Sequence, residues 1–434
     1  MAGGTVLSPQ AAATRLLASL RQPSHILVAI SGGSDSTGLL IALSDAIRDS
    51  HPSHRLSAAT VDHDLRPGSA DEAKSVANLC RKLGIAHSTH RWLGDKPATG
   101  IMAAAREARY DLLADVAAEV QADLIVTGHT LDDQQETLAM RNARVRAGRF
   151  TATGIADAVL FDRRIWVIRP FLSCLRNDIR AFLTERNIGW IDDPSNLDLH
   201  YERVRVRAGL ATGGPVASPG VGSAKAELSA AAARWVEQSV AIDGGVLCRI
   251  APDGIDAAAP EFAHGLSCLA AIFGGQPYGL GQERMQRILG FIGNGAPGRR
   301  TAGGVVFDLR RSALFLMRES RNIDALHLAP GARGIWDGRF EVFNDGHRGV
   351  QIVAAGATSR MAFAAGTPKG AAMRAAASAP TFRFDNEDQC EKGYPLRFAP
   401  YLPPFDRFLT RIDLNLADRL ANAFGRSAYV SPPF

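Results

Sequence analysis

The hydrophobic and polar positions of the first 210 residues follow two periods in alternation. Short apolar runs with the length of buried strands are separated by longer stretches in which apolar side chains recur at helical spacing. We expect strands at 25–30, 56–61, 85–91 and 124–127. We expect helices at 36–48, 72–83, 101–120 and 131–146, preceded by a helix that begins at Pro9, after the N-cap Ser8, and runs through Leu20.

Strands that alternate with helices in this way indicate right-handed βαβ units. The predicted fold class is therefore α/β, with a doubly wound parallel sheet. Ligands of such sheets bind at the carboxyl ends of the strands. The residues that directly follow each predicted strand are accordingly the first place to look for chemistry.

The pattern changes after residue 210. Residues 211–223 are rich in Gly, Pro, Ser and Ala, which is typical of a linker, and a basic hairpin-like region is expected at 299–318. The Ala-, Gly- and Ser-rich segment 356–379 is expected to be flexible. We predict a first domain at 1–210, a linker plus a mixed helical domain at 211–320, and a C-terminal domain at 321–434, the last two being smaller α+β domains.

Composition supports a folded protein. Of 434 residues, 46% are hydrophobic and 21% are charged, which excludes an intrinsically disordered or fibrous chain. The five cysteines form no CxxC pair, the N-terminus has no signal-peptide pattern, and no apolar run approaches the ~18 residues that span a bilayer. We therefore expect a cytoplasmic protein without a membrane segment.

A glycine- and serine-rich segment, Ser-Gly-Gly-Ser-Asp-Ser, joins the first predicted strand to the next helix. Glycines at such a turn let the backbone approach an anion, and the free N–H groups of the helix N-terminus can bind phosphate. The segment matches neither the Walker A signature nor GxGxxG. The candidate phosphate-binding residues are Ser31, Gly32, Gly33, Ser34, Asp35 and Ser36.

This segment resembles the PP-loop of the N-type ATP pyrophosphatases. The resemblance implies that ATP is cleaved between its α and β phosphates and that the substrate is activated as an adenylate. It also implies Mg²⁺, for which Asp35 is the candidate ligand.

Six further segments narrow the resemblance. They are 61–67 (VDHDLRP), 105–110 (AREARY), 128–137 (GHTLDDQQET), 169–172 (RPFL), 192–196 (DDPSN) and 201–207 (YERVRVR). In this order they resemble the tRNA(Ile)-lysidine synthetase family over nearly all of 20–210. Two positions depart from the family pattern, because Thr130 replaces a usual His and Val204 a usual Asn.

The resemblance implies that free L-lysine is joined to C2 of the wobble cytidine of tRNA(Ile) with a CAU anticodon. ATP first adenylates the cytidine, and lysine then displaces AMP. No obligate protein partner is inferred. The site must therefore neutralise triphosphate charge, hold a lysine and accept a proton from its amine.

Neutralising the triphosphate charge requires residues in addition to those of the phosphate loop. Asp62 and His63 follow the second strand and are assigned to ATP binding. Arg106 is assigned to the α-phosphate, where a guanidinium stabilises developing charge. A surface ion pair with Glu107 or Asp111 is the alternative for Arg106.

Lysine binding and proton transfer are assigned to residues that follow the fourth strand. Asp132 and Glu136 are spaced i,i+4 on one helix face, Asp133 lies on the same helix, and His129 precedes it. The alternative is that acids in a first turn merely compensate the helix dipole. Which carboxylate is the base stays open.

Arginine dominates the basic residues, with 43 Arg against 6 Lys and a net charge of +5. Between residues 140 and 187, ten Arg and four acidic residues give a net +6. Basic stripes of this kind bind phosphate backbones. A coding bias or a solvated protein face would produce the same excess of arginine in the sequence. The candidate tRNA-binding residues are Arg141, Arg144, Arg203, Arg205 and Arg207.

The residues leave two other functional classes of protein possible. A different PP-loop enzyme is possible, but a tRNA-thiolating one would need a catalytic cysteine motif, and none is present. A non-catalytic RNA-binding protein is also possible, although the intact SGGSDS and DDQQET segments favour an enzyme.

Overall fold

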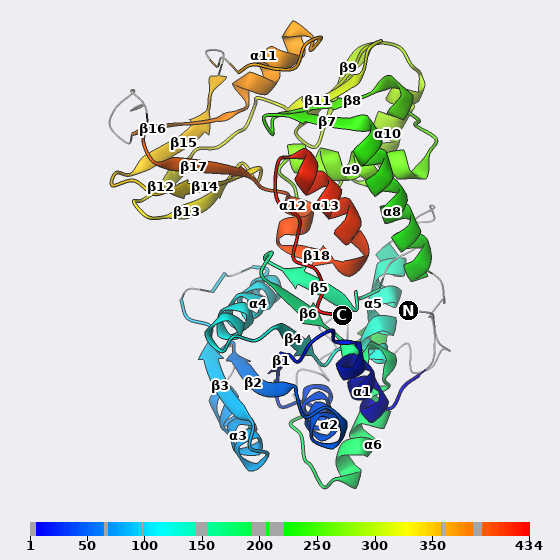
Figure 1. The fold of residues 1–434 in the computed structure, drawn as a ribbon, viewed down its shortest axis with the longest axis vertical. Coiled ribbons are helices and arrows are strands. Elements are labelled where there is room, and N and C mark those ends of the chain that lie inside the picture. The colour runs from blue at the N-terminus through cyan, green and yellow to red at the C-terminus, as the bar shows by residue number, and fades with distance from the viewer. Residues whose placement is uncertain are drawn as a thin grey trace. The chain divides into compact units, whose positions relative to one another are not determined.

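The computed structural model describes residues 6–64, 68–94, 96–97, 99–144, 154–192, 205–207, 221–356, 359, 361–384 and 393–434. The chain forms two compact units (Figure 1). Unit 1 comprises Met1–Ser223 with Val430–Phe434, and unit 2 comprises Ala224–Tyr429.

A central sheet organises unit 1, and six of its strands follow the order β5-β6-β4-β1-β2-β3. The strands are β1 (His25–Ala29), β2 (Arg55–Asp62), β3 (Ala86–Arg91), β4 (Leu124–Thr127), β5 (Ala158–Phe161) and β6 (Ile165–Ile168). The pairs among β3, β2, β1, β4 and β6 are parallel, whereas β5 runs antiparallel to β6. The predicted α/β class is confirmed, with the added feature of one antiparallel strand.

Helices cover both faces of this sheet. They are α1 (Pro9–Ser19), α2 (Ser34–Ser50), α3 (Ser69–Lys82), α4 (Ile101–Glu119), α5 (Leu131–Arg144) and α6 (Arg176–Glu185). Helices α2 and α3 lie on one face and α4 lies on the other (Figure 1). Because both faces are covered, all four residues of β4 are buried, which is why this strand is a continuous apolar run.

The strand order reverses direction at β1. The chain moves outward from β1 to β2 and β3, and then returns to place β4 on the other side of β1. The carboxyl ends of β1 and β4 therefore meet at the topological switch point, where sheets of this kind bind ligands. The SGGSDS segment leaves β1 at this point, and the GHTLDD segment leaves β4 beside it.

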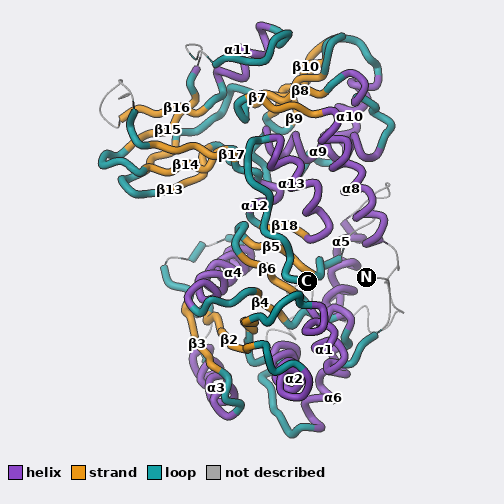
Figure 2. Tube along the Cα trace, in the orientation of Figure 1, coloured by secondary structure: helices purple, strands orange, loops and turns teal. Residues whose placement is uncertain are grey.

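The described part of unit 2 is built of small antiparallel sheets and helices (Figure 2). The first sheet has the order β7 (Val240–Asp243), β8 (Leu247–Ile250), β11 (Leu314–Arg318), β10 (Val305–Leu309) and β9 (Gly298–Ala302). The second sheet has the order β12 (Leu326–Leu328), β15 (Val350–Ala354) and β16 (Pro380–Phe384). The third has the order β13 (Arg333–Trp336), β14 (Phe340–Asn344) and β17 (Leu396–Pro400). The helices are α9 (Pro260–Phe273), α10 (Gln282–Gly293), α11 (Lys369–Ala377), α12 (Pro403–Asp406) and α13 (Leu414–Ala423), and α8 (Val221–Ser239) leads into the unit.

Two features of unit 2 bear on the sequence-based expectations. One hydrophobic core joins Phe315 and Met317 of β11 to Trp336, Val342 and Ile352, residues that lie on both sides of the predicted boundary at residue 320. Helix α11 lies inside 356–379, and its alanines at 371 and 375 are fully buried. The prediction that this whole segment is flexible is therefore wrong, because small alanine side chains pack closely in a helix.

No helix among the described ranges combines the length and the apolar character that a bilayer span requires.

Candidate active site

The phosphate loop closes on itself through hydroxyl groups. The Ser36 Oγ accepts the backbone N–H of Ser31 at 3.1 Å and donates to the Gly33 carbonyl at 3.2 Å. Gly33 caps helix α2, and Gly32 has a φ of +86°, which side-chain-bearing residues rarely adopt. The N–H groups of the first turn have no partner within the helix. The loop therefore has the geometry of an anion site at a helix N-terminus.

Asp35 lies in the first turn of α2 beside this loop. Its Oδ1 accepts the Ser34 hydroxyl at 3.0 Å, and its Oδ2 accepts Nε of Arg176 at 3.0 Å. Burial raises the pKa of the Asp35 carboxyl, whereas the charge and hydrogen bond of Arg176 act against that rise. Asp35 is thus a desolvated carboxylate that depends on a guanidinium for its charged form.

Gly128 allows the end of β4 to pack against the phosphate loop. A Cβ at this position would lie 2.8 Å from the carbonyl carbon of Asp35 and 2.8 Å from the backbone nitrogen of Ser36. Neither backbone atom can move without moving the first turn of α2. The glycine is therefore required by this close approach.

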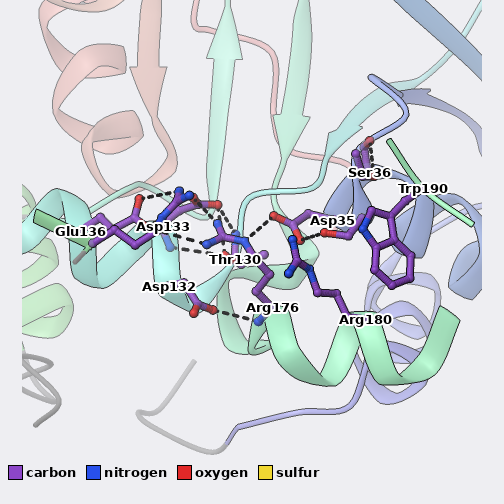
Figure 3. Close-up of polar contacts among 12 residues, drawn as sticks. Asp35, Ser36, Thr130, Asp132, Asp133, Glu136, Arg176, Arg180 and Trp190 are labelled. Atoms are coloured by element: carbon purple, nitrogen blue, oxygen red, sulfur yellow. Dashed lines mark hydrogen bonds and ion pairs between the residues drawn. The ribbon is translucent and has the colours of Figure 1, made fainter. Parts of the chain in front are cut away.

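Arg176 joins the phosphate loop to helix α5 (Figure 3). Its Nε bonds Asp35, its Nη2 lies 3.0 Å from Oδ1 of Asp133, and its Nη1 lies 3.7 Å from Oε1 of Glu136. The Arg176 side chain is 16% exposed. One half-buried guanidinium thus lies among three carboxylates from two helices.

The two aspartates of the DDQQET segment have different partners. Asp132 accepts the backbone N–H of Arg176 at 2.8 Å, so it caps the first turn of α6. Asp133 uses its other oxygen, Oδ2, to accept the backbone N–H of Thr130 at 2.8 Å and the Thr130 hydroxyl at 3.1 Å. Thr130 is fully buried, and its short hydroxyl side chain fits this capping position.

Glu136 lies one turn further along α5, and its side chain is 2% exposed. Nε of Arg207 donates to its Oε1 at 2.6 Å, and Nη2 of Arg207 donates to its Oε2 at 3.4 Å. From the sequence, Arg207 was assigned to tRNA binding. In the structure it forms an ion pair with Glu136, a proposed catalytic carboxylate. His129 lies between β4 and α5, and its Nδ1 forms a hydrogen bond of 2.9 Å with the Thr127 hydroxyl.

Asp62 and His63 lie at the carboxyl end of β2, on the same edge of the sheet. The Asp62 Oδ1 accepts the backbone N–H of Asp64 at 2.8 Å. Burial lowers the pKa of His63, and the nearby Arg109 lowers it further, so the imidazole is kept neutral. Its Nδ1 is buried without a partner among the described residues.

Arg106 is separate from this cluster. It is exposed on α4, with its guanidinium 5.1 Å from the centre of the Tyr110 ring. Within the described ranges it forms no ion pair with Asp35 or with the α5 carboxylates. Arg109, on the same helix, is the arginine that lies beside His63.

The other arginines assigned to tRNA differ in placement. Arg141 is exposed and donates to the Gly154 carbonyl at 3.1 Å, and Arg205 is exposed. Arg203 and the side chain of Arg144 lie outside the described residues.

Comparisons with known proteins show the family of the chain. The family model of the PP-loop domain matches residues 7–212. A tRNA(Ile)-lysidine synthase from Rhizobium meliloti is 44% identical over 97% of this chain and 96% of its own length. The chain belongs to the tRNA(Ile)-lysidine synthase family. The corresponding enzyme from Mesorhizobium japonicum is 38% identical over 97% of this chain and 96% of its own. A tRNA thiolase from Methanococcus maripaludis, 16% identical with a TM-score of 0.38, covers 47% of this chain and 71% of its own.

In this tRNA(Ile)-lysidine synthase family member, the sequence-based reasoning missed Arg176 and gave no role to Gly128. A signal for Arg176 was present, because it is the first residue of α6 and a cation at a helix N-terminus is unfavourable unless acids neutralise it. The acids that do so are distant in sequence, at positions 35, 133 and 136.

The tRNA(Ile)-lysidine synthase family implies a bound Mg²⁺. No group of three or more His, Cys, Asp or Glu able to hold a metal occurs among the described residues. Mg²⁺ that serves a nucleotide commonly takes only one or two carboxylates and completes its shell with phosphate oxygens and waters. The partly exposed Asp35 carboxylate beside the phosphate loop fits that mode.

Proposed function

We propose that this protein is a cytoplasmic ATP-dependent ligase that joins free L-lysine to C2 of the wobble cytidine of tRNA(Ile) with a CAU anticodon. AMP and pyrophosphate are the other products. The similarity to a named lysidine synthase over 97% of the chain carries this proposal. The cluster in which the phosphate-loop carboxylate and the α5 carboxylates share Arg176 supports it.

The first step is adenylation of the cytidine. The cytidine O2 attacks the α-phosphorus of ATP, an O–P bond forms, and the bond to pyrophosphate breaks. The free N–H groups at the start of α2 would hold phosphate oxygens, with hydroxyls from Ser31 and Ser34. Asp35 would hold Mg²⁺, which when bound offsets triphosphate charge. Arg106, although exposed on α4 and apart from the Arg176 cluster, is assigned to the α-phosphate from the resemblance of its segment, and Asp62 and His63 would contact the nucleotide.

The second step transfers lysine. The lysine amine attacks C2, the C2–O bond to AMP breaks, and the amine loses its proton. Carboxylates suit both tasks, since they bind an ammonium and accept its proton. Asp132, Asp133 and Glu136 are assigned to these tasks because they lie together on the first two turns of α5. His129 is assigned to the same step from its place between β4 and α5.

Exposed arginines would bind the tRNA backbone. In unit 1 these are Arg141 and Arg205. In unit 2 they are Arg299 and Arg300 on β9, with Arg284 and Arg287 on α10. Such contacts give salt-dependent affinity without reading sequence.

Sulfur transfer to tRNA is the main alternative within PP-loop enzymes, and the cysteines do not favour it. Burial raises the pKa of Cys80 to about 11, and of Cys174 and Cys268 to about 12. A sulfur-carrying cysteine needs a low pKa and access to the substrate. Cys390 lies outside the described residues.

The proposal is tested by incubating the protein with ATP, labelled lysine and tRNA(Ile) bearing a CAU anticodon. Acid-precipitable label on the tRNA that depends on ATP is the expected result. Activity on another acceptor without transfer of lysine to this tRNA would reject the proposed substrate.

A further inference from the structure

Arg176 is held at both its backbone and its side chain. Its backbone N–H donates to Asp132, and its guanidinium bonds Asp35 and Asp133 (Figure 3). Arginine cannot lose its proton in a protein, and its planar fork can bond two carboxylates at once. Arg176 therefore places a fixed positive charge between the phosphate loop and helix α5.

The surroundings of Asp35 explain why such a charge is needed. Asp35 faces Arg176 from α6, Asp133 from α5 and Ser34 in its own loop. Burial and the negative charge of Asp133 both raise the pKa of Asp35, and Arg176 is the cation that lowers it. Arg176 contacts both of these carboxylates, each at 3.0 Å.

We infer that Arg176 is a positioning residue of the ligation reaction, which holds the carboxylates of Asp35 in the phosphate loop and Asp133 in α5 aligned on one guanidinium. The inference rests on the proposed function. It adds that the ATP-binding and lysine-binding parts of the site share the guanidinium of Arg176, so that one substitution on α6 affects both steps.

The structure offers a matched control on the same helix. Arg186, at the C-terminal end of α6, bonds Asp45 of α2 through Nε at 3.2 Å. Arg176 and Arg186 thus each tie α6 to an aspartate of α2, one inside the site and one outside it. Their side chains are 16% and 32% exposed. Loss of either ion pair removes one link between the two helices.

The experiment compares Arg176→Gln and Arg176→Lys with Arg186→Gln and Arg186→Lys. For each, tRNA-dependent pyrophosphate release and lysine transfer are measured as functions of substrate concentration, and Tm is recorded. Arg176→Gln is expected to lower kcat for both steps on the order of 10²-fold, as misplaced catalytic groups do. The KM for tRNA should stay near wild type, because Arg176 aligns carboxylates and is not assigned to the RNA.

Arg176→Lys keeps a charge but lacks the planar fork through which Nε and Nη2 each bond one carboxylate, so its kcat should also fall, though less than that of Arg176→Gln. The Arg186 variants should change Tm and leave kcat for both steps near wild type. A kcat of Arg176→Gln near wild type for either step, or an equal loss of kcat in Arg186→Gln, would overturn the inference. An inactive wild type would instead reject the proposed function, so the two failures are distinguishable.

Discussion

Nε of Arg207 lies 2.6 Å from Oε1 of Glu136, and this pair joins the segment 205–207 to helix α5. The glutamate is nearly inaccessible to solvent, whereas the arginine is about one-third exposed. A buried carboxylate is stable only with a partner of this kind. The pair therefore connects a segment that the sequence associates with tRNA to a carboxylate proposed to act on lysine.

Replacing Arg207 should impair lysine transfer more than adenylation. In Arg207→Gln the buried Glu136 loses the guanidinium that hydrogen-bonds both of its oxygens and fixes the orientation of its carboxylate. We expect lysine transfer to fall by at least about 10²-fold, the usual contribution of an acid–base group. Single-turnover measurements of pyrophosphate release and of lysine incorporation separate the two steps. Equal loss in both would show that Glu136 does not act specifically on lysine.

Arg205 provides a contrasting prediction from the same segment, because it is exposed. Arg205→Gln should weaken tRNA binding and reduce the slope of log affinity against log salt by about 1, as loss of one phosphate contact does. The KM for lysine should not change. Filter binding at several salt concentrations measures both quantities, and an unchanged slope would mean that Arg205 does not contact the RNA.

Gly128 is predicted to be needed for the phosphate site. In Gly128→Ala the new methyl would lie 2.8 Å from the backbone of Asp35 and Ser36, so the first turn of α2 must shift. Overpacking of this kind costs about 1–3 kcal/mol of stability. The KM for ATP should rise clearly, while tRNA affinity stays near wild type. Gly189, whose Cβ would meet nothing within 4 Å, is the matched position for a neutral glycine-to-alanine control.

Asp35 should determine the acidic limit of adenylation. Its pKa is raised by burial above the usual 3.8, and a ligand for Mg²⁺ must be ionised. Activity should therefore be present above that raised pKa and be lost as the pH falls through it. Asp35→Asn should abolish pyrophosphate release across the pH range and leave tRNA binding nearly intact. Parallel loss of tRNA affinity would show that the loop has been assigned the wrong ligand.

The sequence predicted the fold well because the fold depends on local patterns, and the candidate site was located from patterns of the same kind. The apolar run that became β4 and the glycine-serine loop after β1 are contiguous in the chain. Since parallel strands end at one edge, two such segments are enough to place residues 31–36 and 128–136 together. The antiparallel β5 was not predicted, because a four-residue apolar strand carries no sign of direction.

The partners of individual side chains were much less predictable. Arg176 is more than 140 residues from Asp35 and more than 40 from Asp133. Arg207 belonged to a basic row that composition alone associates with phosphate, and only its distance to Glu136 reveals the ion pair. Periodicity reports which face a residue occupies, and it contains no information about which charge lies opposite. That is why three-dimensional packing was needed to assign partners to these arginines.

The most direct test of the account follows both substrates through one reaction. Wild-type protein is given ATP labelled in the α-phosphate, labelled lysine, and tRNA(Ile) with a CAU anticodon, alongside the same tRNA with uridine in place of the wobble cytidine. We predict that AMP and tRNA-bound lysine form in equal amounts with the first tRNA, and that no lysine is bound by the second. Lysine transfer to the uridine-containing tRNA, or AMP formation with no lysine bound to either tRNA, would contradict the account.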